Sequence, residues 1–156
     1  MTTWPDLAGR LTGSRHRLAA RVYFEDTDFS GVVYHANYLR YLERGRSDFL
    51  RLSGVHHTDL ADGTYGASLA FAVRTMSLEF KAPARIDDVL EVETRLTHLT
   101  AARLGLDQVV LRDEQVLVRA EVEAVVISSD GRPRRLPKAA LALLQPYAIE
   151  AEGDPS

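Results

Sequence analysis

Cysteine is absent from the 156 residues of this sequence. Without thiols the chain cannot form a disulfide, bind zinc through cysteine or use a cysteine nucleophile. The sequence also has no apolar run that approaches the roughly 18 residues of a membrane-spanning helix. Residues 1–18 lack the apolar core of a signal peptide. We therefore expect a cytoplasmic protein without a membrane span.

An excess of positive charge is also missing, because 19 Lys and Arg residues stand against 22 Asp and Glu residues and the formal net charge is −3. Proteins that bind nucleic acid normally carry a basic surface, so we expect no nucleic-acid partner. Hydrophobic residues make up 46% and charged residues 26% of the chain, the balance of a folded globular protein. We place a single domain at residues 16–146, with flexible tails at 1–15 and 147–156.

The hydrophobic pattern predicts one long helix over residues 36–53, with Gly54 as its C-terminal stop. The residues that recur on one side at helical spacing are Tyr38, Leu42, Gly45, Phe49 and Leu52. Charged residues flank that side: Arg40, Glu43, Arg44, Arg46, Asp48 and Arg51. Gly45 costs helix stability, and close approach of a sheet would explain it.

About five strands are predicted around this helix, at residues 17–25, 67–82, 88–97, 101–112 and 115–128, followed by a short helix at 137–144. The apolar phase slips within 67–82, so we expect a bulge near Arg74–Thr75. Short turns join the later strands, and the sheet should be mainly antiparallel. One helix covers only one sheet face. The other face must be polar or lie against a second subunit, and on that ground we expect an oligomer.

Three carboxylates, Glu25, Asp26 and Asp28, lie between the first strand and the long helix, close to Gly31. The first N–H groups of a helix have no internal partners, and the helix dipole makes that end positive. An oxygen that becomes negative in a reaction could bind there, while a carboxylate activates water or attacks directly. The arrangement suits acyl transfer but does not name a substrate.

Residues 21–51 resemble the signature of hotdog-fold thioesterases of the 4-hydroxybenzoyl-CoA thioesterase-like family. The matching residues are Asp26, Asp28, Gly31, Val32, Val33, Tyr34 and Tyr38. The Tol–Pal-associated acyl-CoA thioesterase subgroup is still more similar, through EDTD, GVVYHA, YLERGR and residues 71–94 and 132–138. The resemblance covers roughly residues 17–145. One departure is Phe24, where the subgroup often has tyrosine. Neighbouring Tyr23 should point to the opposite sheet face.

The resemblance implies an α+β hotdog fold, in which an antiparallel sheet of about five strands wraps one long central helix. It implies hydrolysis of acyl-CoA thioesters, with short- to medium-chain aliphatic or aryl acyl groups, to a free acid and coenzyme A. No cofactor or metal is implied. The partners would be acyl-CoA, with an acyl carrier protein as an alternative donor, and a second copy of the chain. The active site would lie at the interface of a homodimer or homotetramer.

Asp28 aligns with the family's catalytic carboxylate, as general base or nucleophile. The backbone N–H of His35 should polarise the thioester carbonyl, and the His35 side chain is a second catalytic candidate. The residues expected to bind substrate or coenzyme A are Gly31, Val33, Tyr34, Phe80, Lys81, Pro83, Arg134, Arg135 and Lys138. The last three are basic and suit the phosphates of coenzyme A.

Each candidate also has a purely structural interpretation. Asp28 could form an Asx-turn, Asp26 is expected to organise the turn, and Asn37 is expected to cap the helix. The pair His56–His57 is expected to lie in a turn, because adjacent side chains diverge. A metal site at Asp26, Asp28 and His35 is not favoured, since the spacing matches no known motif.

The alternative function is a non-catalytic module that binds an acyl thioester or acyl carrier protein. Two further enzyme classes fit the sequence less well. A serine hydrolase is not favoured because Ser30–Gly31 lacks the G-x-S-x-G elbow. A hotdog dehydratase is not favoured because such enzymes use a histidine, whereas the Asp-x-x-Gly pattern fits the thioesterases better.

Overall fold

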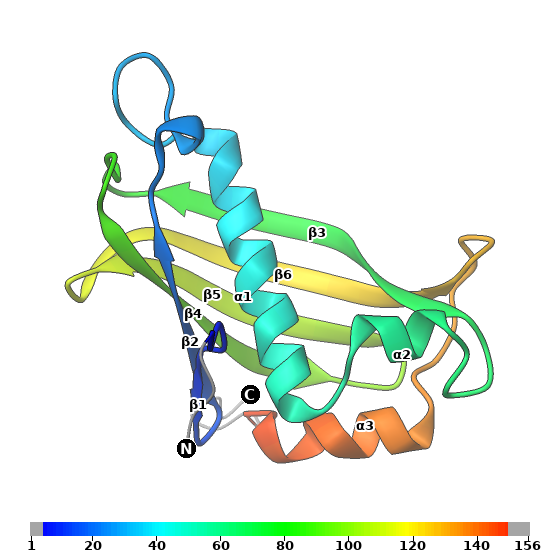
Figure 1. Cartoon of the computed structure of the whole chain (residues 1–156). Coiled ribbons are helices and arrows are strands. Elements are labelled where there is room, and N and C mark those ends of the chain that lie inside the picture. Colours follow the sequence, from blue (N-terminus) through cyan, green and yellow to red (C-terminus); the bar gives the residue numbers. More distant parts are fainter. Residues whose placement is uncertain (1–4, 150–156) are drawn as a thin grey trace.

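One long helix lies across one face of a curved antiparallel sheet in the computed structural model, which describes residues 5–149 (Figure 1). The strands are β1 (Arg10–Thr12), β2 (Arg15–Arg21), β3 (Leu69–Phe80), β4 (Val89–Leu99), β5 (Arg103–Arg112) and β6 (Gln115–Ser128). The helices are α1 (Tyr38–Ser53), α2 (His57–Ala61) and α3 (Lys138–Leu144). Short 3-10 turns are η1 (Phe24–Asp26), η2 (His35–Asn37) and η3 (Gln145–Tyr147). The strand order is β1-β2-β4-β5-β6-β3, and every pair is antiparallel.

Helix α1 approaches the sheet closely at Gly45. A Cβ atom on this residue would lie 2.7 Å from Cγ1 of Val92 and 3.1 Å from Oγ1 of Thr94, so no larger residue fits without displacement. Tyr41, Leu42 and Phe49 are fully buried between the helix and the strands. The sheet's close approach therefore explains the helical glycine, as the sequence predicted. Gly54 ends the helix with φ 103°, the left-handed conformation expected of a glycine stop.

The sheet face opposite α1 is polar. Many of the residues that alternate with the buried ones on β4 and β6 are charged, and ion pairs link neighbouring strands across this face. The Arg17 guanidinium, for example, binds the carboxylates of Glu91, Glu93 and Glu114. Of the two alternatives that the sequence left open for this face, the structure supports the polar one. Because this face is polar, it gives no reason to expect that a second subunit covers it.

Several sequence predictions on strand arrangement are confirmed and others are wrong. The register of β3 against β6 shifts between Val73 and Thr75, where the bulge was expected. The sheet has six strands rather than about five, because β1 forms at residues 10–12 within the predicted N-terminal tail. The first long strand ends at Arg21, not at residue 25, because η1 follows it. Tyr23 and Phe24 are therefore not strand neighbours, and both are exposed.

The ends of the domain also differ from the predicted boundaries. Tyr147 and Ala148 pack against the core, and the N–H of Ile149 donates to the carbonyl oxygen of Leu96 at 2.8 Å. The packed domain thus continues past residue 146. Residues 150–156 of the predicted tail lie outside the described range, as do residues 1–4. The residues between these two segments form no helix that is long and apolar enough to cross a membrane.

Candidate active site

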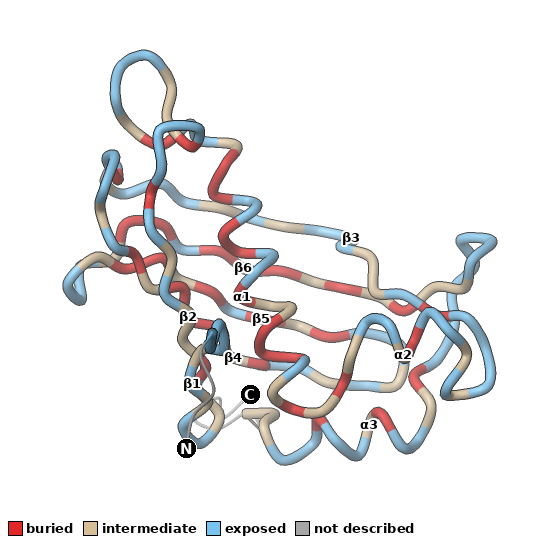
Figure 2. The backbone as a smooth tube through the Cα atoms, viewed as in Figure 1, coloured by how far each residue is buried: buried red, intermediate tan, exposed pale blue. Residues whose placement is uncertain are grey.

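The loop that carries the predicted carboxylates projects from one end of the sheet, next to the start of α1 (Figure 1). A bridge between Thr27 and Val33 closes this loop, and the N–H of Asp28 donates to the carbonyl oxygen of Val32 at 2.9 Å. Gly31 has φ 87°, which lets the chain reverse within few residues. The residues at its tip are mostly exposed, including Phe29 (Figure 2).

One oxygen of the Asp28 carboxylate is anchored and the other has no partner among the described residues. Oδ1 accepts hydrogen bonds from the Ser30 N–H at 2.9 Å and from the Ser30 hydroxyl. These bonds, the hydroxyl first, lower the pKa of Asp28 below its ordinary value, so the group is ionised at neutral pH. The Asx-turn considered from the sequence is present. It fixes the carboxylate and still leaves Oδ2 free to accept a proton or attack a carbonyl.

Asp26 ties the loop to the helix start. This side chain is buried, and its Oδ2 accepts from the backbone N–H of Tyr23 at 2.8 Å while Oδ1 accepts from Nδ2 of Asn37 at 3.0 Å. Its carbonyl oxygen accepts from the N–H of Tyr34. Asp26 therefore organises the turn, as expected. Asn37 makes no capping hydrogen bond, so its predicted role as a helix cap is wrong; it anchors Asp26 instead.

The N–H of His35 points out of the first turn of the helix. Helix α1 begins at Tyr38, and η2 adds one turn before it, so His35 is the first residue of this helical stretch rather than a residue outside it. No described residue accepts a hydrogen bond from the His35 N–H. An unpaired N–H at a helix start is a suitable donor for a developing oxyanion.

Two adjacent depressions flank this helix start. One, of about 280 Å³, is lined by Val33, His35, Tyr38, Phe80, Lys81, Ala82 and Pro83. The His35 ring stands edge-on to Phe80 and to Tyr34. The other depression, of about 450 Å³, contains Asp28 and Tyr34 together with Ala36, Asn37 and their neighbours. The structure thus gathers most predicted site residues at one end of the sheet, with Gly31 in the loop above them.

The predicted basic residues lie at the other end of the sheet. Arg134 and Arg135 are exposed in the connection after β6, and Lys138 begins α3. On the paired strands, Phe80 faces Val118 whereas Leu69 faces Ser128, beside the basic connection. Ten residues of strand separate these ends, roughly 33 Å at about 3.3 Å per residue. Within one chain the basic cluster therefore cannot contact a ligand bound at Asp28.

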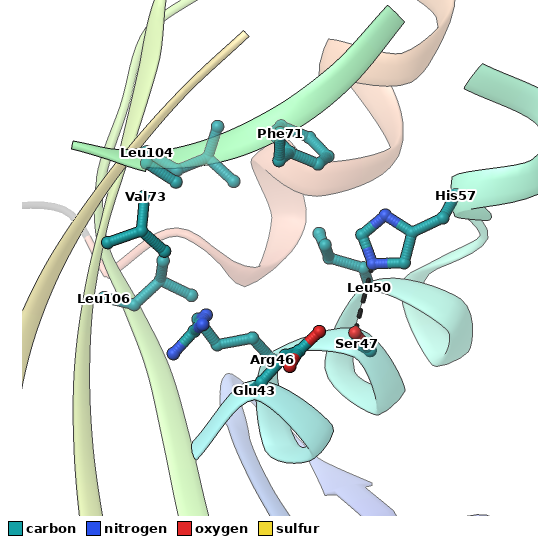
Figure 3. Close-up of a pocket in the computed structure, with 10 residues that line it drawn as sticks. Glu43, Arg46, Ser47, Leu50, His57, Phe71, Val73, Leu104 and Leu106 are labelled. Atoms are coloured by element: carbon teal, nitrogen blue, oxygen red, sulfur yellow. Dashed lines mark hydrogen bonds between the residues drawn. The ribbon is translucent and has the colours of Figure 1, made fainter. Parts of the chain in front are cut away.

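A further cavity escaped the sequence analysis. It lies between α1, α2 and β3, and Arg46, Ser47, His57 and Phe71 are among its lining residues (Figure 3). His57 is the first residue of α2 and its Nε2 lies 3.1 Å from the Ser47 hydroxyl oxygen. The helical pattern had placed Arg46 only on a charged flank of the helix.

No cluster of three or more His, Asp or Glu side chains that could hold a metal occurs within residues 5–149.

A single helix wrapped by an antiparallel sheet, with an ionised carboxylate beside the helix start, is the arrangement of hotdog-fold thioesterases. The sequence model of the Thioesterase-like superfamily matches residues 22–144. Acyl-CoA thioester hydrolase YbgC of Escherichia coli is 40% identical over 129 residues, which cover 81% of this chain and 92% of that protein. Acyl-CoA thioesterase YbgC of Haemophilus influenzae is 35% identical over 119 residues, 76% of this chain and 85% of that protein.

Among solved structures, one described as a probable thioesterase from Bartonella henselae is 51% identical and superposes with a TM-score of 0.77, covering 79% of this chain and 99% of that one. This chain belongs to the Thioesterase-like superfamily. The family and the hotdog fold predicted from the sequence are therefore confirmed, and the protein is an enzyme of the thioesterase class.

Proposed function

We propose that this protein hydrolyses acyl-CoA thioesters to a free acid and coenzyme A. The observation that carries the proposal is that an ionised Asp28 with one free oxygen and the unpaired N–H of His35 both lie beside the same helix start, in two neighbouring depressions. In one route the carboxylate takes a proton from a water molecule whose oxygen attacks the thioester carbonyl carbon. In the other, the carboxylate attacks that carbon itself and forms a mixed anhydride, which water then hydrolyses to the free acid. The His35 N–H stabilises the oxygen as it becomes negative. The thiolate of coenzyme A leaves.

The acyl-CoA relatives support the choice of substrate, and so does the apolar depression beside His35. Phe80 and Tyr38 pack with their ring centres 5.8 Å apart and make one apolar wall. Burial raises the pKa of Tyr38, whose hydroxyl oxygen accepts from the N–H of Ala84, so this ring is neutral and fixed. A thioester has no charge near its carbonyl, and a neutral apolar wall suits it.

We further propose that the active protein is a homodimer that pairs the free edges of β3. The outer edge of this 12-residue strand pairs with no other strand within residues 5–149, and Val73 and Phe80 are about half exposed. An unpaired edge is a template for another strand. A two-fold pairing about the middle of β3 is antiparallel and sets the Phe80 end of one copy beside the Leu69 end of the other.

Such a dimer would bring together the two parts of the predicted site, the Asp28 loop and the basic connection, which lie far apart within one chain. The basic connection of Arg134 and Arg135 lies at the Leu69 end, beside Ser128. In the dimer it would approach the Asp28 loop of the second copy, where it could bind the phosphates of coenzyme A. The mass of the protein in solution, measured by light scattering, tests this. A dimer is expected, and a monomer that retains full activity would contradict the proposal.

The function is tested by release of free coenzyme A from acetyl-, hexanoyl-, benzoyl- and palmitoyl-CoA, and from a hexanoyl acyl carrier protein. The wild type should hydrolyse at least one of the CoA thioesters. Asp28→Asn and Asp28→Ala should each lower kcat by about 100-fold or more, since proton transfer alone contributes about 100- to 10,000-fold. The matched control is Glu25→Gln, which changes an exposed neighbouring carboxylate. Equal rates in the two Asp28 variants and the wild type would exclude this mechanism.

A further inference from the structure

The cavity between α1, α2 and β3 combines apolar walls with one partly buried cation, Arg46. Its volume is about 280 Å³, and Leu50, Phe71, Leu104 and Leu106 supply much of the lining. A cavity of about 150 Å³ already accommodates benzene, so this one has room for a chain of several carbon atoms. Figure 3 shows the Arg46 guanidinium on the side of Val73 and Leu106, and Ser47 and His57 on the other side.

A buried glutamine holds Arg46 in place. Nη1 of Arg46 donates to Oε1 of Gln108 at 3.0 Å, and Gln108 is only 1% exposed. The Gln108 amide nitrogen donates in turn to the carbonyl oxygen of Leu42 and to the Thr94 hydroxyl, both at 2.9 Å. With these bonds the amide orientation is settled, and its oxygen is directed at Arg46. The guanidinium is thus positioned before any ligand arrives.

Most donors of Arg46 are unused within the described chain. A guanidinium has five N–H donors, and only the bond to Gln108 is formed. None of the carboxylates in residues 5–149 comes within ion-pair distance of Arg46. Burial lowers the pKa of Arg46, and the charge of Glu43, which forms no ion pair with Arg46, opposes that effect. A partly desolvated cation with unused donors and no ion-pair partner favours binding of a carboxylate.

We propose that this cavity, called here the Arg46 cavity, binds a carboxylate on a short apolar stem. The carboxylate receives the forked donors of Arg46, and the stem lies against Leu104, Leu106 and Phe71. The Ser47 hydroxyl and the neutral His57 ring line part of the remaining wall and carry no charge themselves. Exposed Glu43 lies in the same lining and disfavours a ligand with a second negative charge there.

Two sources could supply such a group. One is a free carboxylic acid, which is the product class of the proposed reaction. The other is the far end of an acyl group that itself carries a terminal carboxylate. This second source rests on the proposed function and on the β3 dimer, because Phe71 and Val73 on β3 would lie next to the Phe80 end of the second copy. The cavity would then receive the end of an acyl chain whose thioester is bound at the other subunit.

The binding test uses hexanoate and 1-hexanol, which differ in charge but not in chain length, with calorimetry on the intact protein. Wild-type protein should bind hexanoate at least about tenfold more tightly than hexanol. Arg46→Met keeps an unbranched stem and removes the charge, and it should weaken hexanoate binding by about 10- to 100-fold while hexanol changes little. Arg46→Lys should retain part of the preference, because a point charge replaces the fork.

The opposite results would overturn the proposal. Equal affinity of the wild type for the two ligands, or an equal loss of both in Arg46→Met, would show that the cation selects no carboxylate. If Arg46→Met fails to fold, Ala124→Leu serves in its place, because Ala124 lines the cavity on β6 and the larger side chain reduces its volume while the charge of Arg46 is kept. This variant should bind hexanoate at least about tenfold more weakly; unchanged binding would place the ligand elsewhere.

Hydrolysis distinguishes the two sources. If the cavity holds the end of the acyl group, the ratio of kcat/KM for adipoyl-CoA to that for hexanoyl-CoA should fall by about 10- to 100-fold in Arg46→Met. If it holds a free acid, that ratio stays unchanged and only hexanoate binding is lost. A protein that hydrolyses neither thioester would refute the proposed function, while the calorimetry would still decide on the Arg46 cavity.

Discussion

Removing the Asp26 carboxylate should loosen the loop that carries Asp28. In Asp26→Ala, the N–H of Tyr23 and the side-chain amide of Asn37 each lose a hydrogen bond, of 2.8 Å and 3.0 Å. A hydrogen bond to a charged group contributes about 1.5–3 kcal/mol. The Tyr23 side chain is exposed and water can reach its backbone, whereas Asn37 is buried. We therefore expect a loss of about 2–4 kcal/mol in the free energy of unfolding.

Urea unfolding followed by circular dichroism measures this loss, and coenzyme A release measures its effect on the reaction. A loss of about 3 kcal/mol corresponds to a decrease in Tm of roughly 6–12 °C for a domain of this size. Activity should fall through kcat, because the carboxylate of Asp28 loses its fixed position. Glu25→Gln is the control for a charge removed from the exposed neighbour. An Asp26→Ala variant within about 0.5 kcal/mol of the wild type would refute this role.

Three further predictions concern packing, pH and coenzyme A. Gly45→Ala should lower the free energy of unfolding by about 1–2 kcal/mol in urea, because overpacking against Val92 exceeds the gain in helix propensity. Burial lowers the pKa of His57 below 6.5, so the unfolded state binds its proton more readily; stability should fall as the pH drops through 6.5, and His57→Gln should reduce that decrease. An identical pH dependence in the variant would contradict it. Replacing Arg134 and Arg135 by Ser should raise KM for acyl-CoA about two- to tenfold. The same double variant should not change KM for a pantetheine thioester, which lacks the nucleotide phosphates.

Patterns local in the sequence predicted much of this fold. The phase slip near Arg74–Thr75 predicted a bulge in one strand, and the glycine at position 45 predicted close approach of the sheet to the helix. Both interpretations are confirmed. Strand β1 has only three residues, too few to show a two-residue period. The early end of β2 was missed because Tyr23 and Phe24 favour strands, although η1 forms there.

Contacts between distant segments could not be read from the sequence. Asp48 was placed on a charged flank of the helix, yet it is buried and its Oδ2 lies 2.7 Å from Nε2 of His16 on β2. The pattern placed Arg46 on a charged flank as well, yet Gln108 on β5 holds it by a hydrogen bond. Whether a charged residue on the flank of the helix is buried depends on the strands that pack against the helix, and these lie 30 to 60 residues away in the sequence. The Asp26–Asn37 hydrogen bond likewise depends on how the loop returns to the helix start.

The most direct test of the central claim is a crystal structure of Asp28→Asn with a thioether analogue of hexanoyl-CoA. In this analogue a methylene group inserted between the sulfur and the carbonyl prevents cleavage. The carbonyl oxygen should lie within about 3.2 Å of the His35 nitrogen, with the side chain of residue 28 facing the carbonyl carbon. A carbonyl bound elsewhere, with residue 28 turned away from it, would contradict the account.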